Sequence, residues 1–167
     1  MSRTIELHTS LDIPAGLARN ELLQIMKAIH DRRPPYEDAA LHVGLHDLRL
    51  PMPGEIAVPI EASVQGRPFQ YECTLKIEAA NGQKLFPKFE GNVNVSALGD
   101  SASELWLQGA YDVPFGGIGA AIDATVMNGA AERSLEAFLT MLSDAIVHNV
   151  KRDQERSVTR RLGQPGA

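Results

Sequence analysis

The longest regular pattern of apolar residues in the chain runs from Pro114 to Val150. Its apolar positions recur mostly every three to five residues, which is the spacing of one face of an α-helix. They are Ile118, Ile122, Val126, Met127, Ala131, Leu135, Phe138, Leu142, Ile146 and Val150. At a rise of about 1.5 Å per residue this helix would be roughly 50 Å long, so it needs a large apolar surface to pack against. Gly129 near its middle predicts a close approach to that surface or a slight bend.

The surface for this helix is predicted by six stretches in which apolar and polar residues alternate, the pattern of half-buried strands. They cover residues 3–11, 41–50, 56–64, 69–77, 86–97 and 105–111. In the second stretch the apolar side changes face, which predicts a bulge near Asp47. Turn signals such as Asn81-Gly82 separate the strands and favour an antiparallel sheet with one apolar face.

One shorter helix is predicted between the first two strands, from Pro14 to His30. Its apolar residues follow helical spacing, Asp12 is placed to cap its first turn, and Pro14 suits that turn. We expect the helix to end before Pro34 and Pro35, because paired prolines force extended backbone.

The junction between the last strand and the long helix has the most specific local sequence. It reads Leu105-x-Leu107-x-Gly109-x-Tyr111-x-x-Pro114-x-Gly116-x-x-Gly119-x-x-x-Asp123, and it is followed by Ala131-Glu132 and Phe138-Leu139. This junction, together with the order of the elements, resembles the helix-grip fold of the START, Bet v 1 and polyketide-cyclase superfamily.

The resemblance implies an α+β fold in which a curved antiparallel sheet of about six or seven strands wraps the long C-terminal helix, with a short N-terminal helical segment. It also implies a cavity between sheet and helix, of the kind that holds lipids, hormones, polyketides or quinones. We expect a single domain over residues 1–150. Residues 151–167 are expected to form a polar, basic and flexible tail, into which the helix frays.

Composition and charge exclude several classes of function. The chain of 167 residues has a net charge of −5, and a mildly acidic chain is a poor partner for nucleic acid. The sequence contains neither a signal peptide nor a membrane span of about 20 apolar residues, so we expect a cytoplasmic protein without stable membrane insertion. Cys73 is the one cysteine and lies on an apolar strand face, which predicts an inert, protonated thiol. No cofactor is expected, and the oligomeric state stays open.

Two motifs invite a chemical interpretation but fit structural roles better. On a strand, His42 and His46 would lie about 13 Å apart, too far to share one zinc ion. Gly116-Gly117-x-Gly119 opens a helix as a phosphate loop does, yet no parallel strand follows it. We interpret it as a tight corner between strand and helix. No catalytic residue and no metal ligand is therefore assigned.

The candidate ligand-binding residues are those that would face the implied cavity. Tyr71 and Tyr111 are inward polar groups that either orient an oxygen of a ligand or form hydrogen bonds within the core. Met26, Met127, Met141 and Phe138 either line an adaptable apolar pocket or simply pack the core. The full set is Met26, Phe69, Tyr71, Phe89, Tyr111, Met127, Leu135 and Phe138.

This set favours binding of a hydrophobic small molecule or lipid between the sheet and the long helix, without chemistry. Two alternatives stay open. One is an enzyme of the cyclase or dehydratase kind on the same fold, with Tyr71, Tyr111 or a histidine as acid or base. The other is a module without a ligand that binds a protein partner through the sheet or the basic tail.

Overall fold

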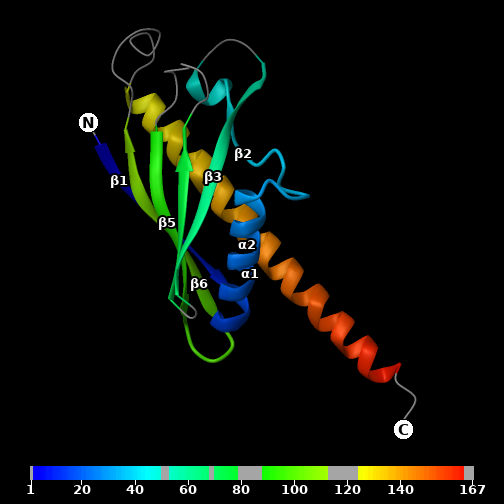
Figure 1. The fold of residues 1–167 in the computed structure, drawn as a ribbon. Helices are drawn as coiled ribbons and strands as arrows, with labels where there is room; N and C mark the ends of the chain where they lie inside the picture. Colours follow the sequence, from blue (N-terminus) through cyan, green and yellow to red (C-terminus); the bar gives the residue numbers. More distant parts are fainter. Residues whose placement is uncertain (1, 50–52, 68–69, 79–87, 113–123, 164–167) are drawn as a thin grey trace.

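The computed structural model describes residues 2–49, 53–67, 70–78, 88–112 and 124–163. Within these ranges six strands form one antiparallel sheet, accompanied by two α-helices and a short 3-10 helix (Figure 1). In chain order the elements are β1 (Ser2–Leu11), α1 (Ala15–His30), β2 (Ala40–Gly44), η1 (His46–Leu48), β3 (Glu55–Arg67), β4 (Gln70–Ile77), β5 (Lys88–Ala97), β6 (Ser103–Asp112) and α2 (Ala124–Leu162).

The core lies on one face of the sheet, whose strand order is β1-β6-β5-β4-β3-β2. Leu75 of β4 and Leu107 of β6 are fully buried there, in one cluster with Met26 of α1 and Ile146 of α2. Both helices therefore cover the same face, and α2 crosses the sheet diagonally and extends beyond it (Figure 1). This is the helix-grip arrangement that the sequence predicts. Among the described helices, none is both long and apolar enough to span a membrane.

The pairing of β1 with β6 fixes where α1 begins. Leu11, at the end of β1, lies opposite Ser103, which in turn lies opposite Ala97 at the end of β5. The buried Ser103 hydroxyl donates a hydrogen bond of 2.9 Å to the carbonyl oxygen of Ile13, in the link between β1 and α1. The first turns of α1 are therefore held beside the end of β5.

The second predicted strand is shorter than expected and has no bulge. β2 ends at Gly44, and the 3-10 turn of η1 then buries Leu48, which is 3% exposed. Arg49 ends that turn with a left-handed φ of 54°. The change of apolar face in this stretch thus reflects a change from strand to turn. The expected cap of α1 is also wrong, because Pro14 occupies the cap position and no side chain forms a hydrogen bond there.

The long helix is confirmed from Ala124 onward, whereas its predicted start and the glycine corner lie outside the described residues. The expectation that it frays after Val150 is wrong, because it continues to Leu162. Residues 151–162 are exposed and rich in Lys, Arg, Gln and Glu, which are good helix formers. Arg160 and Arg161 in the last turn also interact favourably with the helix dipole.

Gly91 of β5 and Gly109 of β6 lie opposite each other and allow two backbones to approach closely. A β-carbon on Gly91 would lie 2.5 Å from the Gln108 carbonyl oxygen and 2.5 Å from the ring of Phe89. The Phe89 ring thus fills the space that the glycine pair leaves free. No comparable contact occurs at Gly129, where an added β-carbon would meet, among the described residues, only the Arg133 side chain. The expected close approach of α2 to the sheet at this glycine is wrong, and the bend stays a prediction.

We predict opposite effects of alanine at two glycines. Gly91→Ala should lower the free energy of unfolding by about 1–3 kcal/mol, because the new methyl group would collide with backbone that cannot move easily. Gly16→Ala on α1 meets nothing within 4 Å and should raise that free energy by about 0.5 kcal/mol. Urea unfolding followed by circular dichroism measures both. Equal stability of the two variants would contradict the close approach.

Candidate functional site

β4 and β5 pair over only part of their length. Their ladder holds five pairs, from Cys73 opposite Val93 to Ile77 opposite Phe89, whereas β5 and β6 pair over ten residues. Both strands continue past Val93 and Cys73, but no further pair joins them among the described residues. Residues 70–72 of β4 and 94–97 of β5 therefore border an open seam, which we call the β4–β5 seam.

A cleft of about 620 Å³ lies between α1 and this seam. Its apolar wall comes from α1, β4 and β5 and consists of Leu22, Leu23, Cys73, Val93 and Val95. Its polar side chains are Arg19, Asn20, Tyr71 and Asn94. A concave, mostly apolar site with a few polar groups, in this size range, is the usual form of a small-molecule site.

Arg19 and Lys27 of α1 are positioned by contacts with the two strands of the seam. The Arg19 guanidinium donates a hydrogen bond of 3.1 Å to the carbonyl oxygen of Val95, which lies beyond the last β4–β5 pair. The Lys27 ammonium lies 5.7 Å from the ring centroid of Tyr71, within the range of a cation–π interaction. Tyr71 itself is 41% exposed and so lies at the mouth of the cleft.

Cys73 is buried on the cleft wall, as its place on an apolar strand face predicts. Burial raises the pKa of its thiol, since a thiolate would lose hydration, and the nearby Lys27 ammonium lowers that pKa in part. The net shift is upward, so the thiol stays protonated at neutral pH and acts as a small apolar group.

The structure separates the eight sequence-predicted residues into groups. Tyr71 lines the cleft, and Phe69 lies outside the described residues. Met26 is fully buried one helical turn beyond Leu22 on α1. The other five are buried in the core between sheet and α2 and are not among the cleft's lining residues: Phe89, Tyr111, Met127, Leu135 and Phe138.

Tyr111 forms a second arrangement that could support chemistry. Its hydroxyl donates a hydrogen bond of 3.2 Å to the carboxylate of Glu132 on α2, and the side chain is 1% exposed. Burial raises the pKa of Tyr111, and the Glu132 charge raises it further, while Arg3 lowers it. A tyrosine with a raised pKa is a proton donor rather than a base at neutral pH.

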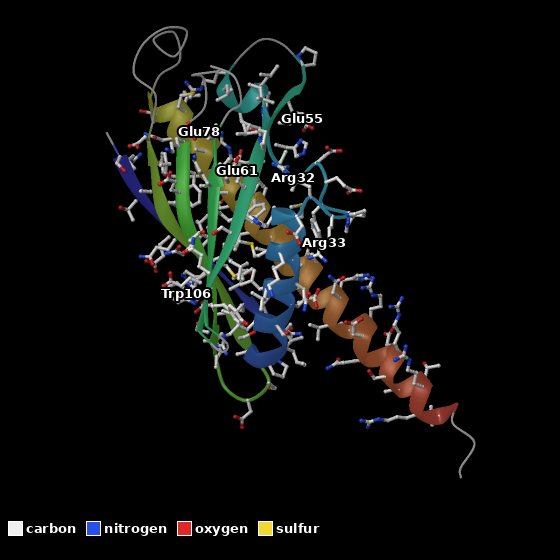
Figure 2. All side chains as sticks on the ribbon, viewed as in Figure 1. Arg32, Arg33, Glu55, Glu61, Glu78 and Trp106 are labelled. Carbon is white, nitrogen blue, oxygen red and sulfur yellow. The ribbon has the colours of Figure 1, made fainter. Side chains whose placement is uncertain are left out.

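A larger depression of about 750 Å³ also touches β3, β4 and β5, but it is a poor candidate for an apolar ligand. Six of its side chains form two rows across these strands on the outer face of the sheet. The rows are Glu61, Lys76, Glu90 and Ser63, Thr74, Asn92. Figure 2 shows Glu61 on the sheet and Arg32 in the segment after α1, and both residues line the depression. Paired charges and hydroxyls of this kind are typical of a solvated face.

The two histidines considered as metal ligands lie on different elements. His42 on β2 contacts the Glu55 carboxylate at 2.7 Å, while His46 belongs to η1. Within the part of the chain that the structure describes, no group of three or more His, Cys, Asp or Glu side chains gathers as a metal site would require.

Sequence reasoning missed Arg19, Lys27, Leu23 and the seam. On sequence alone the two cations are ordinary exposed positions of an amphipathic helix. One signal was present: the fourth stretch, at residues 69–77, places Tyr71 on the apolar face of an otherwise well-alternating strand. The hydroxyl of a tyrosine at this position indicates that this part of the inner face is accessible to solvent.

Comparisons with known proteins agree on the fold alone. No protein-family model and no curated protein matches the chain. Among solved structures, the chain is similar to norcoclaurine synthase from Thalictrum flavum in complex with dopamine and hydroxybenzaldehyde, with a TM-score of 0.56 and 10% identity over 91% of this chain and 88% of that one.

Two further structures show the same likeness. A conserved protein from Geobacillus kaustophilus has a TM-score of 0.54 and 19% identity, covering 89% of this chain and 96% of that one. Ara h 8.0201 has a TM-score of 0.51 and 11% identity, covering 91% of this chain and 99% of that one. These structures share the helix-grip fold with the chain.

We predict that Cys73 alkylation reports on the cleft. In the wild-type protein the rate should rise with pH through an inflection above that of an ordinary thiol, because burial raises the pKa. Lys27→Gln should move the inflection higher still, since it removes the cation that stabilises the thiolate. Lys151→Gln on the exposed end of α2 serves as the control and should leave the profile unchanged. Iodoacetamide labelling followed by mass spectrometry measures the alkylation rate at each pH. An inflection that does not respond to Lys27→Gln would contradict the placement of Lys27 near Cys73.

Proposed function

We propose that this helix-grip protein binds a hydrophobic small molecule or lipid in the cleft between α1 and the β4–β5 seam. The observation that supports this most directly is the apolar wall of a cleft large enough for such a molecule, formed by side chains such as Leu22, Leu23 and Val95. Removing apolar surface of the ligand from water would drive binding, at about 25 cal/mol for each Å² buried.

The predicted ligand contacts fit this proposal as successive layers. Tyr71 would contact the part of the ligand nearest the mouth, where its hydroxyl can form a hydrogen bond with a polar group. Met26 would form the deeper end, because a methionine side chain adapts easily to different shapes. Phe89, Tyr111, Met127, Leu135 and Phe138 would form the inner wall for a ligand that inserts further between the sheet and α2.

A structural neighbour supports small-molecule binding by analogy. The norcoclaurine synthase structure is a complex with dopamine and hydroxybenzaldehyde, so that protein of the same fold holds two small aromatic molecules. At 10% identity this likeness concerns the fold and indicates neither the same ligands nor the same reaction.

A second candidate function, an enzyme of the cyclase or dehydratase kind, is favoured by one contact. Tyr111 and Glu132 form a hydrogen-bonded pair of titratable groups in which the tyrosine is buried. With its raised pKa, Tyr111 would act as the acid that donates a proton to a ligand oxygen, and Glu132 would accept the hydrogen bond that orients its hydroxyl. Neither residue is among those that line the cleft, so we rank this candidate second.

We predict that Leu23→Gln weakens the binding of an uncharged apolar probe such as dodecan-1-ol by about tenfold, because it replaces apolar wall with an amide. Leu17→Gln is the matched control: Leu17 lies on the same helix, is 41% exposed and does not line the cleft. Titration calorimetry gives both dissociation constants. Equal weakening by the two variants, or no binding to the wild type, would contradict the proposed site.

We predict that a ligand carried through purification distinguishes binding from catalysis. Native mass spectrometry before and after organic extraction would identify the bound molecule, which is then incubated with fresh protein. Binding alone predicts that its mass stays unchanged. A product formed by the wild type and lost in Tyr111→Phe would instead support the enzyme.

A further inference from the structure

This inference rests on the proposed function, the binding of a hydrophobic molecule in the cleft. The charges around the cleft indicate which polar group such a ligand carries at its end. The chain is acidic overall, with a net charge of −5. Yet the described residues that line the cleft include the cation Arg19 and no carboxylate, and Lys27 of the same helix lies over the ring of Tyr71, which lines the cleft. A local positive field in an acidic protein is the arrangement that would attract an anion.

Arg19 is held in position and still has donors to offer. One of its terminal nitrogens donates to the Val95 carbonyl oxygen, which fixes the guanidinium at the edge of the seam. A guanidinium has five N–H donors, so most remain available after this bond. Two of them can bind the two oxygens of one carboxylate in a planar, bidentate contact.

Lys27 of α1 adds a second positive charge near the cleft, beside Tyr71 of β4. Its ammonium lies over the Tyr71 ring, and its field reaches Cys73 on the cleft wall, where it favours the thiolate. An ammonium in this place would favour any negative charge at the mouth. A lysine ammonium has three N–H donors on a flexible stem, so it could turn from the Tyr71 ring toward a ligand.

We propose that the cleft binds an amphiphile with a carboxylate headgroup, whose alkyl chain lies along Leu22, Leu23 and Val93. Arg19 binds the carboxylate at the mouth, and Lys27 adds attraction across the cleft. The apolar wall supplies most of the affinity, and the two cations supply the selectivity for an anionic head over a neutral one.

Titration calorimetry with probes of equal chain length tests this proposal on the full chain. The probes are dodecanoate, dodecan-1-ol and dodecyl phosphate. We expect the wild type to bind dodecanoate about tenfold more tightly than dodecan-1-ol, as one charge-assisted bond provides. Arg19→Gln combined with Lys27→Gln should remove this preference and leave the dissociation constant of dodecan-1-ol within about twofold, whereas Arg19→Lys should keep part of it.

Lys151→Gln is the control for the loss of a positive charge and should keep the full preference, because Lys151 is exposed on the distal part of α2. Added salt should reduce the preference and leave dodecan-1-ol binding nearly unchanged. Retained binding of dodecan-1-ol also shows that the double variant still folds with an intact cleft.

The outcomes separate this inference from the function on which it rests. If the wild type binds dodecanoate and dodecan-1-ol equally, the cleft binds apolar molecules but the headgroup proposal is wrong. If it binds dodecyl phosphate more tightly than dodecanoate, the choice of carboxylate is wrong. If it binds none of the probes, the proposed function fails and this inference fails with it.

Discussion

The pairing of the first strand with the last is the constraint on which the rest of the structure depends. Ten residues of β1 lie opposite ten residues of β6, although α1 and the other four strands lie between them in the sequence. Since Leu11 lies opposite Ser103, the chain leaves β1 beside the end of β5, and the Ser103 hydroxyl holds the link at Ile13. α1 can then cross the inner face only from that end, while α2 follows the other end of β6. The two helices share one apolar face but meet different parts of it.

The candidate site is a consequence of this arrangement. α1 begins where β4 and β5 stop pairing, so its first turns lie over an incomplete part of the sheet rather than over a closed ladder. Arg19 donates a hydrogen bond to the carbonyl oxygen of Val95, beyond the last β4–β5 pair. One local feature thus gives an opening in the sheet, an apolar wall from the helix and a cation fixed at the rim. This combination favours a ligand that is apolar along its length and polar at one end.

Binding and catalysis would use different parts of the molecule. The cleft lies under the first half of α1, whereas Tyr111 and Glu132 join the end of β6 to α2. Phe89 lies opposite Tyr111 on the sheet, and its side chain is buried in the same core as Leu135. A ligand in the cleft could reach Tyr111 only if these side chains repacked, which costs free energy in a core of ordinary density. Binding without chemistry therefore needs fewer assumptions than catalysis does.

The sequence by itself determined the elements and the fold class, because burial on one face leaves a period of two in strands and about 3.6 in helices. That is why six strands, the helix ending at His30 and the long helix were all predictable. Apolar periodicity cannot predict a helix or turn that continues beyond the packed core. The exposed turns of α2 after Val150 have no apolar stripe, and the face change before Leu48 is a turn rather than a bulge.

Only the tertiary structure decided the site. The register of β1 against β6 determines which strands α1 crosses. This pairing joins the first and last strands of the chain, so no local sequence pattern predicts it. Arg19, Lys27 and Tyr71 therefore come together through topology, although each is an ordinary residue within its own element.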